Sequence, residues 1–257
     1  MAKYKIGITE AGDAGIDLSW AEKMDTVDGA VVVTKAITSG FIQKVLEHKD
    51  KLVVHVTCTG YGGTILEPNV LHPKLQRNAA TDMVLRGFPR EKVVIRVDPI
   101  IPTEKGLETA LKTIEMFMDE GFNRFRVSVI DMYPHVRDRF KERKLPLPYG
   151  EDKFAPDKEQ LAAVDAMLLE AREYWANLGK DPSILYFESC AEPGLRQAIA
   201  IGCISSVDLC FLGLDTDDID STGPQRPKCM CYSGKTELLT HKRQCPHGCL
   251  YCYWKTK

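Results

Sequence analysis

The cysteines near the end of the chain are the residues best suited to chemistry. Cys245, Cys249 and Cys252 have the spacing C-x3-C-x2-C, within the segment Cys-Pro-His-Gly-Cys-Leu-Tyr-Cys. Three thiolates this close in sequence can bind three irons of a [4Fe-4S] cluster, which leaves the fourth iron without a protein ligand. An open coordination position distinguishes a reactive metal site from a purely structural one. The spacing therefore predicts a catalytic iron–sulfur cluster on these three cysteines.

A second group of cysteines precedes this motif. The chain has nine cysteines, an odd number, and no apolar leader of the secretory type, which favours metal binding over disulfide bonds. Four thiolates could hold a second [4Fe-4S] cluster or a structural zinc ion. The alternative for Cys190 and Cys203 is that both are small buried apolar side chains. The candidate ligands of this second centre are Cys190, Cys203, Cys229 and Cys231.

The elements that must position these residues are visible as short β-branched runs that alternate with amphipathic stretches. The runs are mostly continuous in their hydrophobicity, which is typical of strands buried on both faces of a parallel sheet. The expected strands are 4–9, 30–34, 52–58, 93–97, 124–130, 184–187, a weaker one at 204–209 and a last one at 237–241.

Helices are expected between these strands. They are 39–46 with Ser39 as N-cap, 107–121 closed by Gly121, 157–179 opened by Asp157, and a short one at 195–201. This alternation predicts an α/β fold, as a complete or partial (β/α) TIM-like barrel. An open doubly wound sheet is the alternative. The proline-rich and charged residues 134–156 are expected to form a long loop over the strand ends.

Composition narrows the class of protein. The 257 residues carry 34 Lys and Arg against 36 Asp and Glu, so the formal net charge is -2. This balance excludes a strongly basic nucleic-acid-binding chain and a charged disordered chain. No apolar run is long enough to cross a bilayer, and no secretory signal is evident. We therefore expect a cytoplasmic protein without membrane contact, with one domain over 1–257 whose segment 224–257 binds the cluster.

The motif C-x3-C-x-aromatic-C, with Tyr251 directly before the last cysteine, resembles the signature of the radical S-adenosyl-L-methionine (radical SAM) superfamily. The resemblance implies that SAM binds the open iron through its amino and carboxylate groups. An electron from the reduced cluster then cleaves a C–S bond of SAM, and the resulting 5′-deoxyadenosyl radical abstracts hydrogen from a substrate. It also implies an electron donor such as flavodoxin or ferredoxin. In most members the motif follows the first barrel strand, whereas here it ends the chain.

A circular permutation accounts for this position. If the barrel begins with the run at 237–244, the run at 4–9 is its second strand and the later runs follow in order. The strand ends then resemble the branch that contains spore photoproduct lyase. The matching segments are Thr9-Glu10-Ala11-Gly12-Asp13, Thr34-Lys35, Thr57-Cys58-Thr59 and Arg96-Val97-Asp98-Pro99. The chain also resembles a bacterial family of unknown function whose members end in C-x-C and then C-x-H-G-C-x-Y-C.

The resemblance implies roles at these strand ends, where barrels of this kind place their sites. Lys35 would pair with the carboxylate of SAM. Thr9 or Asp13 would accept from its amino group, and Thr57 or Thr59 would bond its ribose or carboxylate. The substrate is unknown, and the lyase-like resemblance points to modified nucleic acid as one possibility.

Two other functions fit the same residues. A non-catalytic protein could use the C-terminal cysteines, with His247 as a further ligand, to hold zinc or an iron–sulfur cluster and bind a nucleic acid or another partner. A barrel hydrolase could use carboxylates at strand ends, with the cysteines purely structural; its candidates are Asp98, Glu188 and Glu192.

Overall fold

The computed structural model describes residues 4–190, 192–218, 230–232 and 234–255. These residues form a single eight-stranded sheet in which every pairing is parallel. Its spatial order is β7-β6-β5-β4-β3-β2-β1-β8. The strands are β1 (Ile6–Ile8), β2 (Gly29–Thr34), β3 (Leu52–Thr57), β4 (Val93–Ile100), β5 (Arg124–Val129), β6 (Tyr186–Cys190), β7 (Ile199–Ile201) and β8 (Thr236–Glu237).

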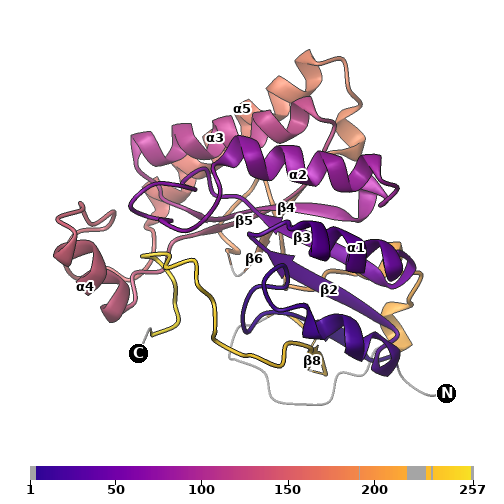
Figure 1. The fold of residues 1–257 in the computed structure, drawn as a ribbon. Coiled ribbons are helices and arrows are strands. Elements are labelled where there is room, and N and C mark those ends of the chain that lie inside the picture. The colour runs from indigo at the N-terminus through magenta and orange to yellow at the C-terminus, as the bar shows by residue number, and fades with distance from the viewer. Residues whose placement is uncertain (1–3, 191, 219–229, 233, 256–257) are drawn as a thin grey trace.

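The helices pack against the sheet, and α1, α2, α3 and α5 are seen along one of its faces in Figure 1. The α-helices are α1 (Ser39–Glu47), α2 (Pro73–Leu85), α3 (Glu104–Asp119), α4 (Pro134–Glu142), α5 (Lys158–Asn177) and α6 (Ser206–Phe211). Segments of 3-10 helix are η1 (Leu18–Thr26), η2 (Lys49–Lys51), η3 (Arg90–Lys92), η4 (Pro182–Ile184) and η5 (Thr216–Asp218).

The central strands are buried on both faces, as their continuous hydrophobic runs predict. All six residues of β3 are buried. Val54 and Val56 pack into the core under the helices, whereas Val53 packs with Cys203, Cys231 and neighbouring apolar side chains on the other face. Alternate residues of a strand point to opposite faces, so one short run supplies two separate cores. The α/β class and the parallel sheet are confirmed.

Local capping explains where two of the expected helices begin. Asp157 caps α5 in a capping box, because its carboxylate accepts from the amide of Gln160 while the Gln160 side chain accepts from the amide of Asp157. Thr38 rather than Ser39 caps α1, through a hydrogen bond of 3.1 Å from the amide of Phe41. The N-cap of α1 therefore lies one residue earlier than the sequence suggested.

Three predictions about elements were wrong. Residues 134–156 include α4, which begins at Pro134 because proline fits the first helical turn. The expected helix at 195–201 is not formed, and its end becomes β7, paired with β6. The expected strand at 204–209 overlaps α6, which Ser205 caps in a capping box with Asp208. Helix α2 was not predicted at all.

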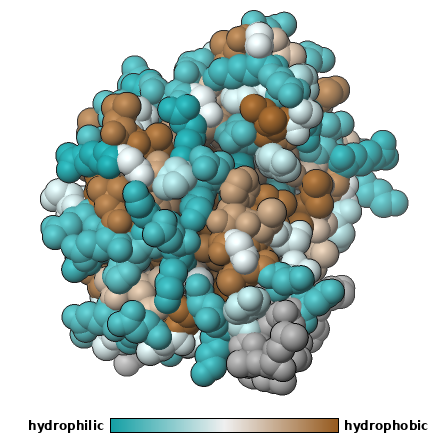
Figure 2. Space-filling model, turned by 90° about the vertical axis from the view of Figure 1, so that its right-hand side faces the viewer, coloured by the Kyte–Doolittle hydropathy of each residue, from teal (hydrophilic) through white to brown (hydrophobic). Residues whose placement is uncertain are grey.

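The two edge strands of the sheet are β7 and β8. Strand β8, the last in the chain, pairs in parallel with β1, the first. The labelled ends of the chain lie on opposite sides of the molecule in Figure 1. Figure 2 shows a face on which hydrophobic and hydrophilic side chains are interspersed. None of the described helices combines the length and hydrophobicity needed to cross a membrane.

Candidate metal centre

The cysteine loop, defined as residues 245–252, follows β8 and is held against the segment that follows β3. Asn69 donates from Nδ2 to the carbonyl of Pro246 at 2.8 Å, and the amide of Leu250 donates to the carbonyl of Leu66 at 3.0 Å. Gly248 adopts a φ of 66°, a left-handed conformation that glycine reaches without a steric cost. The hydrogen bonds at Pro246 and Leu250, together with the conformation of Gly248, thus fix the path of the loop from residue 246 to residue 250.

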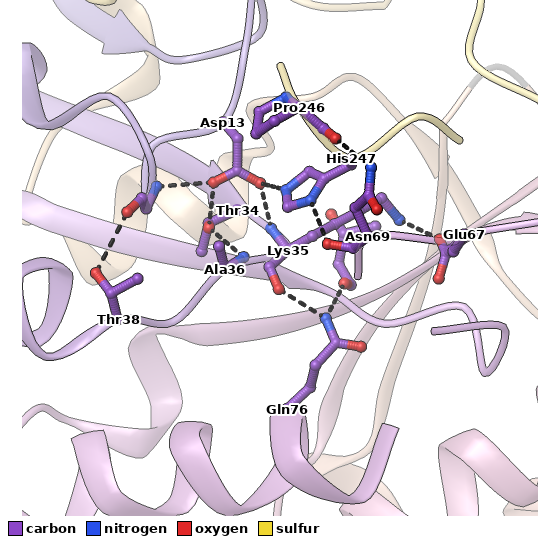
Figure 3. A network of polar contacts seen from close by, with 12 residues as sticks. Asp13, Thr34, Lys35, Ala36, Thr38, Glu67, Asn69, Gln76, Pro246 and His247 are labelled. Atoms are coloured by element: carbon purple, nitrogen blue, oxygen red, sulfur yellow. Dashed lines mark hydrogen bonds and ion pairs between the residues drawn. The ribbon is translucent and has the colours of Figure 1, made fainter. Parts of the chain in front are cut away.

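Asp13 anchors the loop from the other side (Figure 3). Its Oδ1 accepts from the amide of Gly15 at 2.8 Å and from the Thr34 hydroxyl at 2.6 Å. Its Oδ2 accepts from the amide of Lys35 at 2.7 Å and lies 2.7 Å from Nε2 of His247. Burial raises the pKa of Asp13, but the contact with His247 and these other donors outweigh it, so the pKa lies below its usual value.

The ring nitrogens of His247 contact protein groups and are not available as metal ligands. Its Nε2 contacts Asp13, and its Nδ1 lies 3.4 Å from the backbone carbonyl of Asn69. Both ring nitrogens therefore face protein acceptors, and neither offers a free lone pair to a metal. The imidazole instead links the cysteine loop to the ends of β1 and β2.

The three cysteines of the loop lie close enough to influence one another electrostatically: Cys252 and Cys249 each interact with Cys245. Among the described residues, however, they do not form a set of three ligand atoms within 4.8 Å of one another. One metal ion needs its ligands at that spacing, whereas three irons of a cluster accept wider separations. Burial raises the pKa of the Cys249 thiol to about 12, an effect that Lys35 opposes. A metal must therefore displace the proton of Cys249 to bind it.

A buried ion pair adjoins the loop. Lys35 Nζ lies 2.7 Å from Oε1 of Glu67 and 2.9 Å from the hydroxyl of Tyr251, and that hydroxyl also donates to Glu67. Glu67 is fully buried, and its second oxygen, Oε2, has no hydrogen-bond partner. Burial opposes ionisation of both partners, but their mutual attraction raises the pKa of Lys35 and lowers that of Glu67. The pair is therefore charged and leaves one buried carboxylate oxygen without a hydrogen-bond partner.

The structure places the other predicted cofactor residues at different distances from this pair. Thr59 is buried and close enough to Glu67 to lower its pKa. Thr9 is buried and accepts a hydrogen bond of 2.8 Å from the amide of Val33, which ties β1 to β2. Thr57 is buried at the end of β3, where its carbonyl accepts from Gln76. Of these three threonines, Thr59 is thus the one seen to contact the ion pair electrostatically.

The second group of cysteines also converges. Cys190 Sγ lies 3.6 Å from Cys203 Sγ, and the amide of Cys203 donates to Sγ of Cys231 at 2.7 Å. The Glu10 carboxylate joins Cys203 and Cys231 in a set whose ligand atoms all lie within 4.8 Å of one another. Cys229, the fourth predicted ligand, lies outside the described residues.

Glu10 and Glu67 are the two site residues that the sequence analysis did not assign. Neither lies on a periodic hydrophobic pattern, because both occupy loops that follow strands, β1 and β3. Their only sequence signal is a carboxylate within a strand-end loop. Burial and the neighbouring Cys203 raise the pKa of Glu10 to about 7, against the opposing effect of Lys235.

The three carboxylates considered for a hydrolase each interact with different partners. Asp98 pairs with Arg96 and accepts from Ser128. Glu188 is buried and pairs with Arg126 at 2.6 Å. Burial raises the pKa of Glu192 to about 7. A hollow of about 400 Å³ between η1 and α1 contains none of these carboxylates and no cysteine.

Comparison with known proteins gives a family assignment. The family model described as "Domain of unknown function (DUF1848)" matches residues 18–254. The match spans nearly the whole chain, so the chain belongs to this family. A search of curated proteins finds no match.

Proposed function

We propose that this member of the DUF1848 family is a radical SAM enzyme whose [4Fe-4S] cluster is bound by Cys245, Cys249 and Cys252. The observation that carries the proposal is the position of the cysteine loop beside the buried Lys35–Glu67 pair, joined to it by Tyr251. The cysteine loop and a paired positive and negative charge thus meet near the carboxyl ends of β2 and β3, where parallel α/β folds place their ligands.

The donor set fits an iron–sulfur cluster better than a single zinc ion. Three thiols are present, the one histidine of the loop has both nitrogens engaged, and the sulfur atoms are not gathered at single-ion spacing. Lys35 lies near Cys249 and supplies a positive charge beside a negatively charged cluster. These features support a cluster with three protein ligands and one open iron.

The ion pair suits the amino-acid end of SAM. An ammonium has three N–H donors, of which Glu67 and Tyr251 take two, so Lys35 retains one for the carboxylate of SAM. The unpartnered Oε2 of Glu67 can accept from the amino group of SAM. When bound, the reduced cluster would supply the electron that cleaves a C–S bond of SAM. Lys35 and Glu67 would orient SAM for that step, and Tyr251 would hold them in register with the loop.

The order of the strands supports a circularly permuted barrel. Counted from β8, neighbouring strands follow one another around the sheet as β8, β1, β2 and onward to β7. The cysteine loop then follows the first strand of that order, as it does in the superfamily that the motif resembles. Asp13, proposed at first to contact SAM, has a further role in this arrangement, since it fixes His247 and hence the loop.

The proposal is tested by iron and sulfide content on protein purified without oxygen, followed by SAM binding and reductive SAM cleavage. We expect about four irons and four sulfides per chain, all lost in the Cys245→Ala/Cys249→Ala/Cys252→Ala variant. With a chemical reductant or a flavodoxin-type donor, SAM should yield 5′-deoxyadenosine. Zinc in the loop in place of iron, in a sample never exposed to air, would overturn the proposal.

The ion pair is tested separately in protein that retains its iron. Lys35→Met and Glu67→Gln should each weaken SAM binding roughly 30- to 150-fold, because a charge-assisted hydrogen bond contributes about 2–3 kcal/mol. Lys44→Met is the matched control, since Lys44 forms an exposed ion pair with Glu47 on α1. If both site variants bind SAM as tightly as the control does, the pair has no part in SAM recognition.

A further inference from the structure

The two edges of the sheet come together at the second group of cysteines. Strands β7 and β8 are the edge strands, and no hydrogen-bonded ladder joins them within the described residues. Cys203 follows β7, whereas Cys231 precedes β8. A side chain at Gly202 would bring its Cβ within 2.5 Å of the backbone of Cys231, so the two edges touch there. The seam between β7 and β8 is therefore closed by this contact rather than by strand pairing.

Two more ligand groups reach the seam from the strands next to these edges. Cys190 ends β6, the neighbour of β7, and Glu10 follows β1, the neighbour of β8. Glu237 at the end of β8 positions Glu10, because its Oε2 accepts from the amides of Glu10 and Ala11 at 2.9 Å each. Each side of the seam thus contributes two ligand groups to one place.

We propose that Glu10, Cys190, Cys203 and Cys231 bind one zinc ion that closes the sheet between β7 and β8. The Glu10, Cys203 and Cys231 ligand atoms already lie within 4.8 Å of one another, and Cys190 Sγ lies 3.6 Å from Cys203 Sγ. Two sulfurs bound tetrahedrally to one zinc at about 2.3 Å are roughly 3.8 Å apart. The Cys190–Cys203 separation matches that geometry. Cys190 Sγ is not one of the three ligand atoms that lie within 4.8 Å of one another, so its side chain would turn toward Glu10 and Cys231 to complete the tetrahedron.

The same spacing distinguishes this centre from the alternatives. Cys190 and Cys203 are free thiols at this separation, not a disulfide, whose S–S distance is about 2.05 Å. Thiolates bound to different irons of a cluster are held much farther apart than thiolates bound to one ion. The second centre expected from the sequence is accordingly assigned a single ion, with Glu10 as the ligand that the spacing of cysteines could not reveal.

Charge and hydrogen bonding around the four groups also suit a divalent ion. Three thiolates and one carboxylate bring four negative charges, of which a divalent ion offsets two. Lys235 lies 2.5 Å from Glu10, and Arg96 lies near Cys190 and Cys203, although Arg96 also pairs with Asp98. These cations reduce the remaining charge. The amide of Cys203 donates to Cys231 Sγ, the kind of N–H···S contact that orients a metal-bound thiolate.

Metal analysis of the Cys245→Ala/Cys249→Ala/Cys252→Ala variant tests the proposal, because this variant lacks the ligands of the C-terminal loop. We expect one zinc per chain and no iron. Adding Cys203→Ser should abolish zinc binding, whereas adding Cys210→Ser should leave it intact, because Cys210 is an exposed residue of α6. The proposal would be overturned if the triple variant itself held no zinc. It would also be overturned if Cys203→Ser and Cys210→Ser affected zinc binding equally. The result does not depend on the radical SAM assignment.

Two measurements guard against a variant that fails to fold. Zinc-edge X-ray absorption on the unsubstituted chain should show three sulfur ligands and one oxygen ligand. Glu10→Gln, which keeps the size of the side chain, should lower zinc affinity about 10- to 100-fold in competition with a chromophoric chelator. Four sulfur ligands, or an unchanged affinity in Glu10→Gln, would remove Glu10 from the site. Four irons with sulfide retained in the triple variant would replace the zinc ion with a cluster.

Discussion

Asp13 shows how one side chain can position a loop that lies 234 residues away in the sequence. The carboxylate accepts from residues on the β1 and β2 ends and from His247, so the cysteine loop is fixed to the sheet before any metal binds. Preorganisation of this kind would reduce the entropy that binding of the proposed cluster must otherwise overcome. The roles of Asp13 and His247 are therefore in positioning.

Gly248 helps to position the cysteine loop through its backbone conformation. We predict that Gly248→Ala lowers the free energy of unfolding by about 1–2 kcal/mol, because an L-residue is strained at a φ of 66°. The added Cβ would meet only Asn69 Nδ2 and Pro68 Cγ at 3.6 Å, so the cost lies in the backbone. Relief of this strain should displace the loop and reduce the iron content measured after anaerobic purification.

Gly213→Ala is the control for that experiment. Gly213 has a φ of 70° and no atom within 4 Å of an added Cβ, so it carries the same backbone strain away from the cysteines. Both variants should lose similar stability in urea unfolding, and only Gly248→Ala should lose iron. Equal iron contents in the two variants would show that the conformation of residue 248 is unimportant to the site.

At the scale of elements, α4 and the chain end form a second attachment. The guanidinium of Arg139 donates to the carbonyls of Cys252 and Trp254 at 2.7 Å each, and Leu250 accepts at 3.3 Å. Arginine offers a rigid fork of donors, which suits several carbonyls at once. The segment expected to be a loop thus contains a helix that holds the last residues of the cysteine motif.

A buried ionic group joins β3, β5, β6 and α6. Arg126 on β5 pairs with Glu188 on β6 and with Asp208 on α6, and Arg124 also pairs with Asp208 at 2.6 Å. His55 on β3 lies 3.7 Å from Asp208 and is fully buried. Burial, and then the charge of Arg126, lower the pKa of His55 to about 3. His55 is therefore neutral in the folded protein.

This arrangement predicts a pH dependence of stability. Between pH 6.5 and about pH 3 the unfolded chain protonates His55 while the folded chain does not, so protons favour unfolding. The contribution of His55 is fully present above pH 6.5 and is lost as the pH falls, by up to about 1.4 kcal/mol per pH unit. Urea unfolding measured at several pH values between 7.5 and 4 gives the free energy of unfolding as a function of pH. This free energy should fall less steeply with decreasing pH for His55→Leu than for the unsubstituted chain.

His241→Gln is the matched control, because His241 is exposed. Asp208 is present in all three proteins, and the control variant keeps its contact with His55. If the free energy of unfolding depends on pH equally in His55→Leu and in the control, the neutral, buried state of His55 does not govern acid stability.

At the scale of the whole molecule, the sheet places the last strand of the chain beside the first. Because β8 and β1 are parallel, a connection from the end of β8 to the start of β1 must cross the full height of the sheet. The two ends of the chain lie accordingly on opposite sides of the molecule in Figure 1. A crossover helix is the usual element in such a connection.

A re-permuted chain tests whether this order is a true permutation. We predict that joining residue 257 to residue 4 through a linker of about 25 residues, and opening the chain within 219–229, gives a protein that folds and binds iron. Its melting temperature should lie within about 5 °C of the original, or roughly 1–2 kcal/mol. A linker of about 4 residues should prevent folding, because it spans at most about 14 Å whereas the two ends lie on opposite sides of the molecule in Figure 1.

The length series distinguishes the two readings of the sheet. If the chain with the short linker folds as well as the chain with the long one, measured by circular dichroism and iron content, the two chain ends lie within reach of about 4 residues. If neither folds, the covalent order of the natural chain is essential and the permuted arrangement is not interchangeable with it.

The sequence by itself determined what depends on local pattern. The spacing of Cys245, Cys249 and Cys252 predicted a metal-binding loop, and buried β-branched runs such as β3 predicted the parallel α/β sheet that the structure has. Short elements were less determined: residues 199–201 form a strand only because β6 offers a partner, and 206–211 form a helix because Ser205 and Asp208 cap it. In such segments tertiary contacts outweigh weak local preferences.

Only the tertiary structure decided which distant groups share a site. Glu67 meets Lys35, and Glu10 meets Cys203, because parallel strands bring their carboxyl ends together whatever their separation along the chain. A carboxylate in a strand-end loop carries no periodic signal of its own, so its partner cannot be read from its neighbours in the sequence. The neighbouring strands β2 and β3 place the first pair, and the contact between the β7 and β8 edges places the second.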